Sequence, residues 1–164
     1  MPESHPRIIL KFDGSNGPTN EWDRIGWAYL IELEDGLALR GFGHKVEKSN
    51  ATVAEFEGLL HGLKRLQSLK RLRTRLTGDG QVSDPVSTLL VQGDSVTVIN
   101  LLMQKDSSKV KKGLKPLYTA ALKLIRESGL SWEAQKISKP KNKECHGLAS
   151  AELEACLRES MSNS

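Results

Sequence analysis

The stretch from residue 7 to residue 17 places the strongest constraint on how this chain can fold. It begins with a run of β-forming residues, continues with the carboxylate Asp13, and ends in a polar turn rich in Gly, Ser and Asn. This pattern predicts a strand that ends at an acidic residue. A side chain held at the end of a core strand is well placed for chemistry, so the other elements can be interpreted by what they bring to Asp13.

The hydrophobic periodicity predicts a sheet in which strands come first and helices later. The turn signal Glu34-Asp35-Gly36 separates two short β-like runs, which therefore pair as an antiparallel hairpin. Later strands alternate with helices, so they should run parallel through right-handed crossovers. The fold class that follows is α/β, with a five-stranded mixed sheet flanked by helices. The predicted elements are strands at 7–13, 26–33, 37–46, 88–92 and 132–137, and helices at 53–66, 98–102, 114–125 and 145–157.

Length and composition bound the organisation of the chain. With 164 residues and 38% hydrophobic residues, one domain with a real core is expected, over residues 7–158 with tails at 1–6 and 159–164. No apolar run is long enough for a membrane span, and the start lacks the features of a signal peptide. Cys145 and Cys156 lie too far apart on one predicted helix for a disulfide, so two buried thiols in a reducing compartment are expected. We predict a monomer in the cytoplasm, or in the nucleus of a eukaryote.

Three acidic residues form the candidate chemical site. Asp94 directly follows a predicted strand, as Asp13 does, and ligands gather at the carboxyl ends of parallel strands. On the helix between them, Glu55 is expected to point inward, whereas Glu57 is expected to point outward beside His61. Converging carboxylates suit hard divalent cations such as Mg²⁺. Each acid alone could instead cap a turn or a helix, so the metal interpretation depends on all three meeting.

Several segments resemble signature motifs of type 1 ribonuclease H, closest to its compact members without a basic handle. The resemblance covers about residues 7–157 in the expected order. The segments that carry it are Phe12-Asp13-Gly14-Ser15-Asn16-Gly17, Thr52-Val53-Ala54-Glu55-Phe56-Glu57-Gly58, Gly93-Asp94-Ser95-Val96, Lys115-Pro116-Leu117-Tyr118 and Lys139-Pro140-Lys141-Asn142-Lys143-Glu144.

The resemblance implies an endonuclease that hydrolyses the RNA strand of RNA/DNA hybrids with two Mg²⁺ or Mn²⁺ ions. It implies that Asp13, Glu55 and Asp94 are catalytic metal ligands. Backbone near the first motif would approach ribose 2′-hydroxyls, by which RNA is distinguished from DNA. The positions implied to contact nucleic acid are Gly14, Ser15, Asn16, Asn50, Thr52, Ser95, Lys141 and Asn142.

His146 marks the main departure from the family pattern. The family has a fourth metal-binding Asp at this position, so His146 is predicted to be a site residue that ligates a borderline metal, holds a water or moves a proton. The simpler alternative is a histidine at the start of a helix with no role in the site. The residues ahead of Glu55 and the turn after Asn16 also differ from the family pattern.

Three functions therefore compete. The leading one is an active ribonuclease H, and the second is a catalytically weakened hybrid-binding module of the same fold. The third is the nuclease domain of a mobile-element polyprotein. The net charge of +4 favours a polyanionic partner. Basic residues cluster at 64–75, at 105–115 and in the loop at 139–143, although solvated helix faces would give the same pattern.

Overall fold

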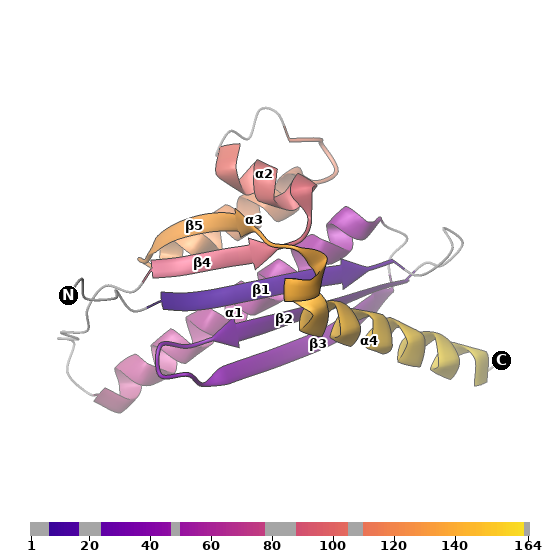
Figure 1. Ribbon diagram of the computed structural model, residues 1–164, viewed down its shortest axis with the longest axis horizontal. Helices are drawn as coiled ribbons and strands as arrows, with labels where there is room; N and C mark the ends of the chain where they lie inside the picture. Colours follow the sequence, from indigo (N-terminus) through magenta and orange to yellow (C-terminus); the bar gives the residue numbers. More distant parts are fainter. Residues whose placement is uncertain (1–6, 17–23, 47–49, 78–87, 105–109, 163–164) are drawn as a thin grey trace.

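The architecture is an open five-stranded mixed sheet with helices on both faces (Figure 1). A computed structural model describes residues 7–16, 24–46, 50–77, 88–104 and 110–162. The strand order is β3-β2-β1-β4-β5, with antiparallel pairing from β1 to β3 and parallel pairing of β1 with β4 and of β4 with β5. The fold class predicted from the sequence is confirmed, including the parallel arrangement of the helix-crossed strands.

The strands follow the predicted order with small shifts at their ends. Gly36, with φ of 88°, adopts the left-handed conformation that the hairpin turn requires. The Leu33 N–H donates to the Leu37 carbonyl at 2.8 Å and closes the turn. The strands are β1 Arg7–Ser15, β2 Arg24–Glu32, β3 Ala38–Val46, β4 Thr88–Gly93 and β5 Ser131–Lys136.

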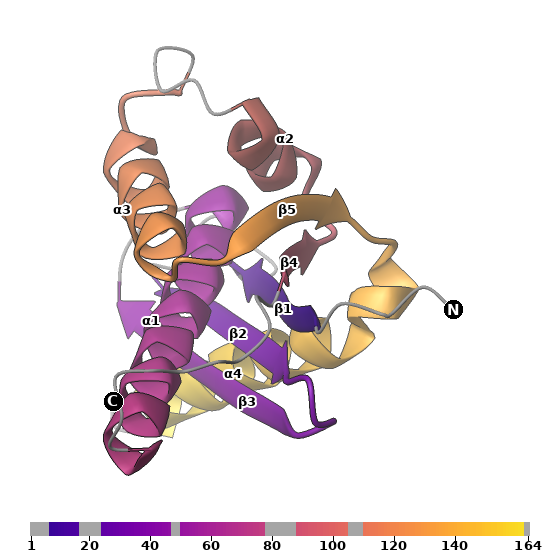
Figure 2. The same cartoon turned by 90° about the vertical axis from the view of Figure 1, so that its left-hand side faces the viewer.

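The helices lie on the two faces of the sheet in unequal numbers. Figure 2 shows α1 and α3 on one face and α4 on the other, where α4 packs against β1, β2 and β3. A 3₁₀ helix, η2, leads directly into α4. The bounds are α1 Ala51–Thr77, α2 Val96–Gln104, α3 Lys115–Glu127, η2 Lys139–Asn142 and α4 Lys143–Ser162.

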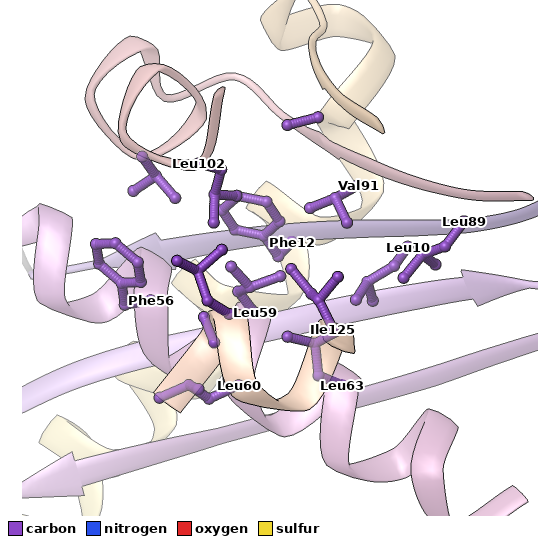
Figure 3. Packing of buried hydrophobic residues seen from close by; sticks show 14 of the residues in the cluster. Leu10, Phe12, Phe56, Leu59, Leu60, Leu63, Leu89, Val91, Leu102 and Ile125 are labelled. Carbon is purple, nitrogen blue, oxygen red and sulfur yellow. The ribbon is translucent and has the colours of Figure 1, made fainter. Parts of the chain in front are cut away.

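The main core lies between the sheet and helices α1, α2 and α3. Leu10 and Phe12 of β1 pack there with Phe56 and Leu59 of α1 and with Ile125 of α3 (Figure 3). On the opposite face a smaller cluster joins β2 to α4. No helix in the described parts of the chain combines the length and apolarity that a bilayer crossing demands.

Several sequence-based boundaries need correction. β1 continues to Ser15, because Gly14 and Ser15 remain paired with Trp27 and Gly26 of β2, so Asp13 is not the last residue of its strand. Helix α1 extends to Thr77 rather than ending near residue 66. Helix α4 runs to Ser162, past the predicted domain end at 158, while the predicted tail at 1–6 lies outside the described residues.

The predicted orientation of Glu57 was wrong. Its side chain was expected to point outward, but Glu57 is only 8% exposed. The physical reason is that α1 packs on β2 and β3 as well as on β1, so Glu57 lies against the end of β3 beside Lys45. The predicted neighbour His61 is present, with Nε2 3.6 Å from Glu57 Oε2.

Candidate active site

The two aspartates meet at one end of the sheet. β1 and β4 are parallel neighbours in which Lys11 pairs with Gln92. Asp13 and Asp94 each lie two residues further along, so both stand at the carboxyl end of this strand pair. Asp13 is buried, at 4% exposure, whereas Asp94 is half-buried. The predicted convergence of strand-end acids is therefore present in the structure.

Glu55 reaches this end of the sheet because α1 approaches β1 very closely. A Cβ atom at Gly14 would lie 2.3 Å from the Ala54 carbonyl carbon and 2.3 Å from the Glu55 nitrogen. A Cβ atom at Gly58 would lie 2.8 Å from the Asp13 carbonyl oxygen. Only glycine permits these contacts, so Gly14 and Gly58 bring the backbone of Glu55 against the strand that carries Asp13.

The electrostatics show that the three carboxylates act on one another. Burial raises the pKa of Glu55 to about 7; a hydrogen bond from Ser95 opposes the rise, and the charges of Asp13 and Asp94 add to it. Burial also raises the pKa of Asp13, and the charge of Asp94 raises it further. Neighbouring carboxylates thus disfavour the ionisation of Asp13 and of Glu55.

His146 lies against Asp13 rather than in isolation. Its Nδ1 atom is 3.0 Å from Asp13 Oδ2, while the Gly14 N–H donates to Asp13 Oδ1 at 2.9 Å. Both Asp13 oxygens therefore have a hydrogen-bonding neighbour, and both contacts lower the pKa of Asp13 against the effect of burial. The His146 side chain is 65% exposed, so the ring edge away from Asp13 is open to solvent.

Two of the residues predicted to contact nucleic acid also cap helices. The Asn50 side-chain oxygen accepts the Val53 N–H at 3.0 Å at the start of α1. The Ser95 hydroxyl accepts the Val98 N–H at 3.2 Å at the start of α2, while its side chain also hydrogen bonds to Glu55. Capping therefore fixes the two helix starts that border the acids.

The other predicted contacts differ in their exposure. Lys141 is exposed on η2, whereas Gly14, Ser15, Asn16 and Thr52 are half-buried. Asn142 is 1% exposed and donates from Nδ2 to the Phe12 carbonyl at 2.9 Å, so it ties η2 to β1. This bond holds the start of α4, and with it His146, beside Asp13. Contact of these residues with nucleic acid stays a prediction.

The carboxylate oxygens of the three acids suit a hard cation, although the side chains are not arranged as a closed metal site. The described residues contain no group of three or more His, Cys, Asp or Glu side chains arranged to hold a metal ion. Asp13, Glu55 and Asp94 nevertheless supply only oxygen ligands, and their mutual repulsion would be relieved by a divalent cation. The residues that could hold Mg²⁺ or Mn²⁺ are therefore these three, with His146 adjacent.

Sequence reasoning missed Gly58 as a determinant of the site. Its signal was a glycine inside a strongly helical pattern, which costs helix stability and often indicates close packing. The contact that it makes with Asp13 depends on the tertiary arrangement, so the sequence alone could not show its partner.

Solved structures share this fold at low sequence identity. The N-terminal RNase H domain of Rv2228c from Mycobacterium tuberculosis has a TM-score of 0.73 and 18% identity, covering 94% of this chain and 99% of that one. LC11-RNase H1, solved in complex with an RNA/DNA hybrid, has a TM-score of 0.71 and 22% identity, covering 92% and 99%. RNase H1 from the halophilic archaeon Halobacterium salinarum has a TM-score of 0.66 and 17% identity, covering 91% and 98%. No protein-family model and no curated protein matches the sequence. These similarities show an RNase H-like fold.

Proposed function

We propose that this protein is a metal-dependent nuclease that hydrolyses the RNA strand of RNA/DNA hybrids. The observation that carries the proposal is the set of three mutually repelling carboxylates, Asp13, Glu55 and Asp94, at the carboxyl end of the central strands. Folding alone gives no reason to gather like charges in a partly buried position, whereas a cation-binding site does. The fold is shared with a protein solved in complex with an RNA/DNA hybrid, which supports this substrate class.

Each residue of the site has a defined task in this proposal. Asp13, Glu55 and Asp94 would hold divalent cations, which supply an activated water and stabilise the leaving oxygen of a phosphodiester. Ser95 orients Glu55 through its hydrogen bond. Gly14 allows the backbone of β1 to stay close to Glu55, which keeps the carboxylates together.

Exposed lysines next to the acids are suited to the phosphates of a hybrid. Lys139 and Lys141 of η2 and Lys143 at the start of α4 are all exposed. The buried Asn142 between them ties η2 to the carbonyl of Phe12, the residue before Asp13, which places this basic segment at the same end of β1 as the acids. Phosphate contacts of this kind supply affinity and register, whereas RNA would be recognised through its 2′-hydroxyls near Gly14 and Ser15.

A second candidate function is hybrid binding with weak or no catalysis. The observation that favours it is the contact between His146 Nδ1 and Asp13 Oδ2, because an imidazole beside Asp13 adds no anionic ligand. In this alternative the lysines and the shared fold serve binding, and the carboxylates have lost part of their cation affinity.

One assay separates the two candidates. Purified protein is incubated with a labelled RNA/DNA hybrid in Mg²⁺ or Mn²⁺, beside single-stranded RNA, double-stranded RNA and a DNA duplex of the same sequence. Cleavage confined to the RNA strand of the hybrid, and abolished by EDTA, is the expected result. Hybrid binding without cleavage in either metal would favour the binding module, and neither binding nor cleavage would contradict both.

A further inference from the structure

A second acidic residue on α1 is buried outside the candidate active site. Glu57 lies two residues beyond Glu55, and its side chain is enclosed between α1 and the end of β3. Lys45 Nζ of β3 lies 3.3 Å from Glu57 Oε1, and His61 Nε2 lies 3.6 Å from Oε2. A buried carboxylate requires such partners, so Glu57 links α1 to the edge strand of the sheet.

His61 extends this link to β2 by stacking on an indole. The ring centroids of His61 and Trp27 are 3.8 Å apart, and the ring planes differ by 5°. Trp27 itself lies over Gly43 of β3, where a Cβ atom would come within 2.4 Å of the indole Cζ2. Trp27 is therefore in contact with the β3 backbone and with α1. Burial lowers the pKa of His61, an effect that Glu57 opposes and Lys64 and Lys45 enhance, which favours a neutral ring in the stack.

The same elements place the catalytic carboxylates. Trp27 pairs with Gly14 in the β1–β2 ladder, and Gly14 touches the backbone of Glu55. Gly58, next to Glu57, touches the carbonyl oxygens of Asp13 and Ala28. A shift of α1 along the sheet would therefore change both the Glu57 contacts and the distance between Glu55 and Asp13.

We propose that Lys45, Glu57, His61 and Trp27 form a brace that fixes α1 on β2 and β3 and thereby positions Glu55 beside Asp13. These four are positioning residues, because they would act on the carboxylates through the placement of α1. The effect of the brace on metal binding rests on the proposed function. Its effect on the contact between Gly14 and Glu55 does not. The contacts with Lys45 and His61 account for the burial of an acidic side chain two residues from Glu55.

The experiment compares His61→Ala, His61→Phe and Gln67→Ala with the parent protein. Gln67 is a matched control, since its Nε2 also ties α1 to another element, donating to Glu127 Oε2 of α3 at 3.0 Å. Mn²⁺ affinity is measured by counting free Mn²⁺ with electron paramagnetic resonance. The amide signals of Gly14 and Glu55 are recorded by NMR in metal-free protein, and thermal unfolding is followed for each variant.

We expect His61→Ala to weaken Mn²⁺ binding at least fivefold and to shift both amide signals. His61→Phe keeps the stack on Trp27, so its Mn²⁺ affinity should stay within twofold of that of the parent. Gln67→Ala should lower the melting temperature without changing the Mn²⁺ affinity or the amide signals of Gly14 and Glu55. The brace is overturned if His61→Ala lowers only the melting temperature, or if Gln67→Ala moves both readouts equally. A His61→Phe variant as impaired as His61→Ala would overturn the stack as the positioning contact.

Two further controls keep the result decisive. If His61→Ala does not fold, Glu57→Gln replaces it, because the substitution keeps the side-chain size and removes only the charge that binds Lys45. Parent-like readouts in that variant would overturn the brace. A parent that takes up no Mn²⁺ would contradict the proposed function, and the Gly14 and Glu55 signals would then decide the brace alone.

Discussion

His146 Nδ1 lies 3.0 Å from Asp13 Oδ2, across 133 positions of the sequence. This contact joins the start of α4 to the central strand, and Asn142 supports it by its bond to the Phe12 carbonyl. A carboxylate beside Nδ1 orients the imidazole ring and directs its Nε2 edge away from Asp13. The exposed His146 ring therefore presents its second nitrogen to solvent beside Asp13.

The first prediction concerns the aspartates. Asp13→Asn or Asp94→Asn should abolish hybrid cleavage and leave the fold intact, because each change removes an anionic ligand and also relieves repulsion among the acids. Cleavage rates and circular dichroism spectra are compared with those of the parent. Asp35→Asn is the matched control, since Asp35 lies in the exposed β2–β3 turn and its role as acceptor for the Leu37 N–H is retained. Full cleavage by either site variant would show that the carboxylate site is misassigned.

The second prediction concerns the pH dependence of stability in metal-free protein. The pKa of Glu55 is raised from 4.5 to about 7, so between these values the folded state keeps a proton that the unfolded state has lost. Stability contributed by this group is present below pH 4.5 and is lost as pH rises toward 7. Glu55→Gln should therefore be more stable than the parent at pH 8 by about 1–2 kcal/mol, a range reduced for partial solvent exposure.

Urea unfolding in EDTA from pH 4 to pH 8 measures this difference directly. The expected gain for Glu55→Gln disappears at pH 4, where Glu55 is protonated in both states. Glu133→Gln, at an exposed position of β5, serves as the control and should show no such dependence. A difference in the free energy of unfolding between Glu55→Gln and the parent that is the same at all pH values would contradict a raised pKa of Glu55 in the folded protein.

The fold was predictable because its signals are local and mutually consistent. The hairpin turn at Gly36, the change to helical spacing after β3, and the strand before Asp94 together predict the succession of the elements and which strands run parallel or antiparallel. The convergence of Asp13 and Asp94 follows from parallel pairing alone. Glu55 was correctly placed inward because it shares a helical side with buried Leu59 and Leu66.

The remaining features depend on contacts between segments distant in sequence. The burial of Glu57 results from Lys45 at the end of β3, and the helix periodicity carries no signal for it. The burial of Asn142 results from a hydrogen bond to β1. The extension of β1 past Asp13 depends on a partner strand that continues alongside it. In each case the determining partner is a tertiary neighbour, which local propensity cannot identify.

The third prediction concerns the salt dependence of hybrid binding. If lysines of η2 and α4 and those at 111–115 neutralise about four to six phosphates, log Kd should rise with log salt with a slope of that order between 50 and 200 mM. Lys141→Gln should reduce the slope by about one and weaken binding to all sequences alike. Lys123→Gln, at an exposed position of α3, is the control. Hybrid affinity that does not change with salt would reject an electrostatic interface. An equal loss of affinity in Lys123→Gln would show that the interface is not confined to η2 and the start of α4.

The last prediction concerns His146 and the choice of metal. A neutral imidazole brings no negative charge to the site and prefers metals softer than Mg²⁺, so Mn²⁺ should be the better activator of the parent protein. His146→Asp adds an anionic oxygen ligand beside Asp13 and should improve activity in Mg²⁺ roughly tenfold, with little gain in Mn²⁺. His146→Ala should lose activity in Mn²⁺, because it removes both the nitrogen and the bond to Asp13 Oδ2.

His44→Ala is the matched control for these variants. His44 is also a histidine in contact with a carboxylate, its Nδ1 lying 2.7 Å from Glu152 Oε1, but it joins β3 to α4 away from the three acids. Its replacement should leave the ratio of Mn²⁺ to Mg²⁺ activity unchanged. Cleavage rates are measured for each variant over a range of Mn²⁺ and Mg²⁺ concentrations. Identical metal dependence in the parent, His146→Asp and His146→Ala would show that His146 takes no part in the chemistry, and the contact with Asp13 would then serve only to hold α4 on the sheet.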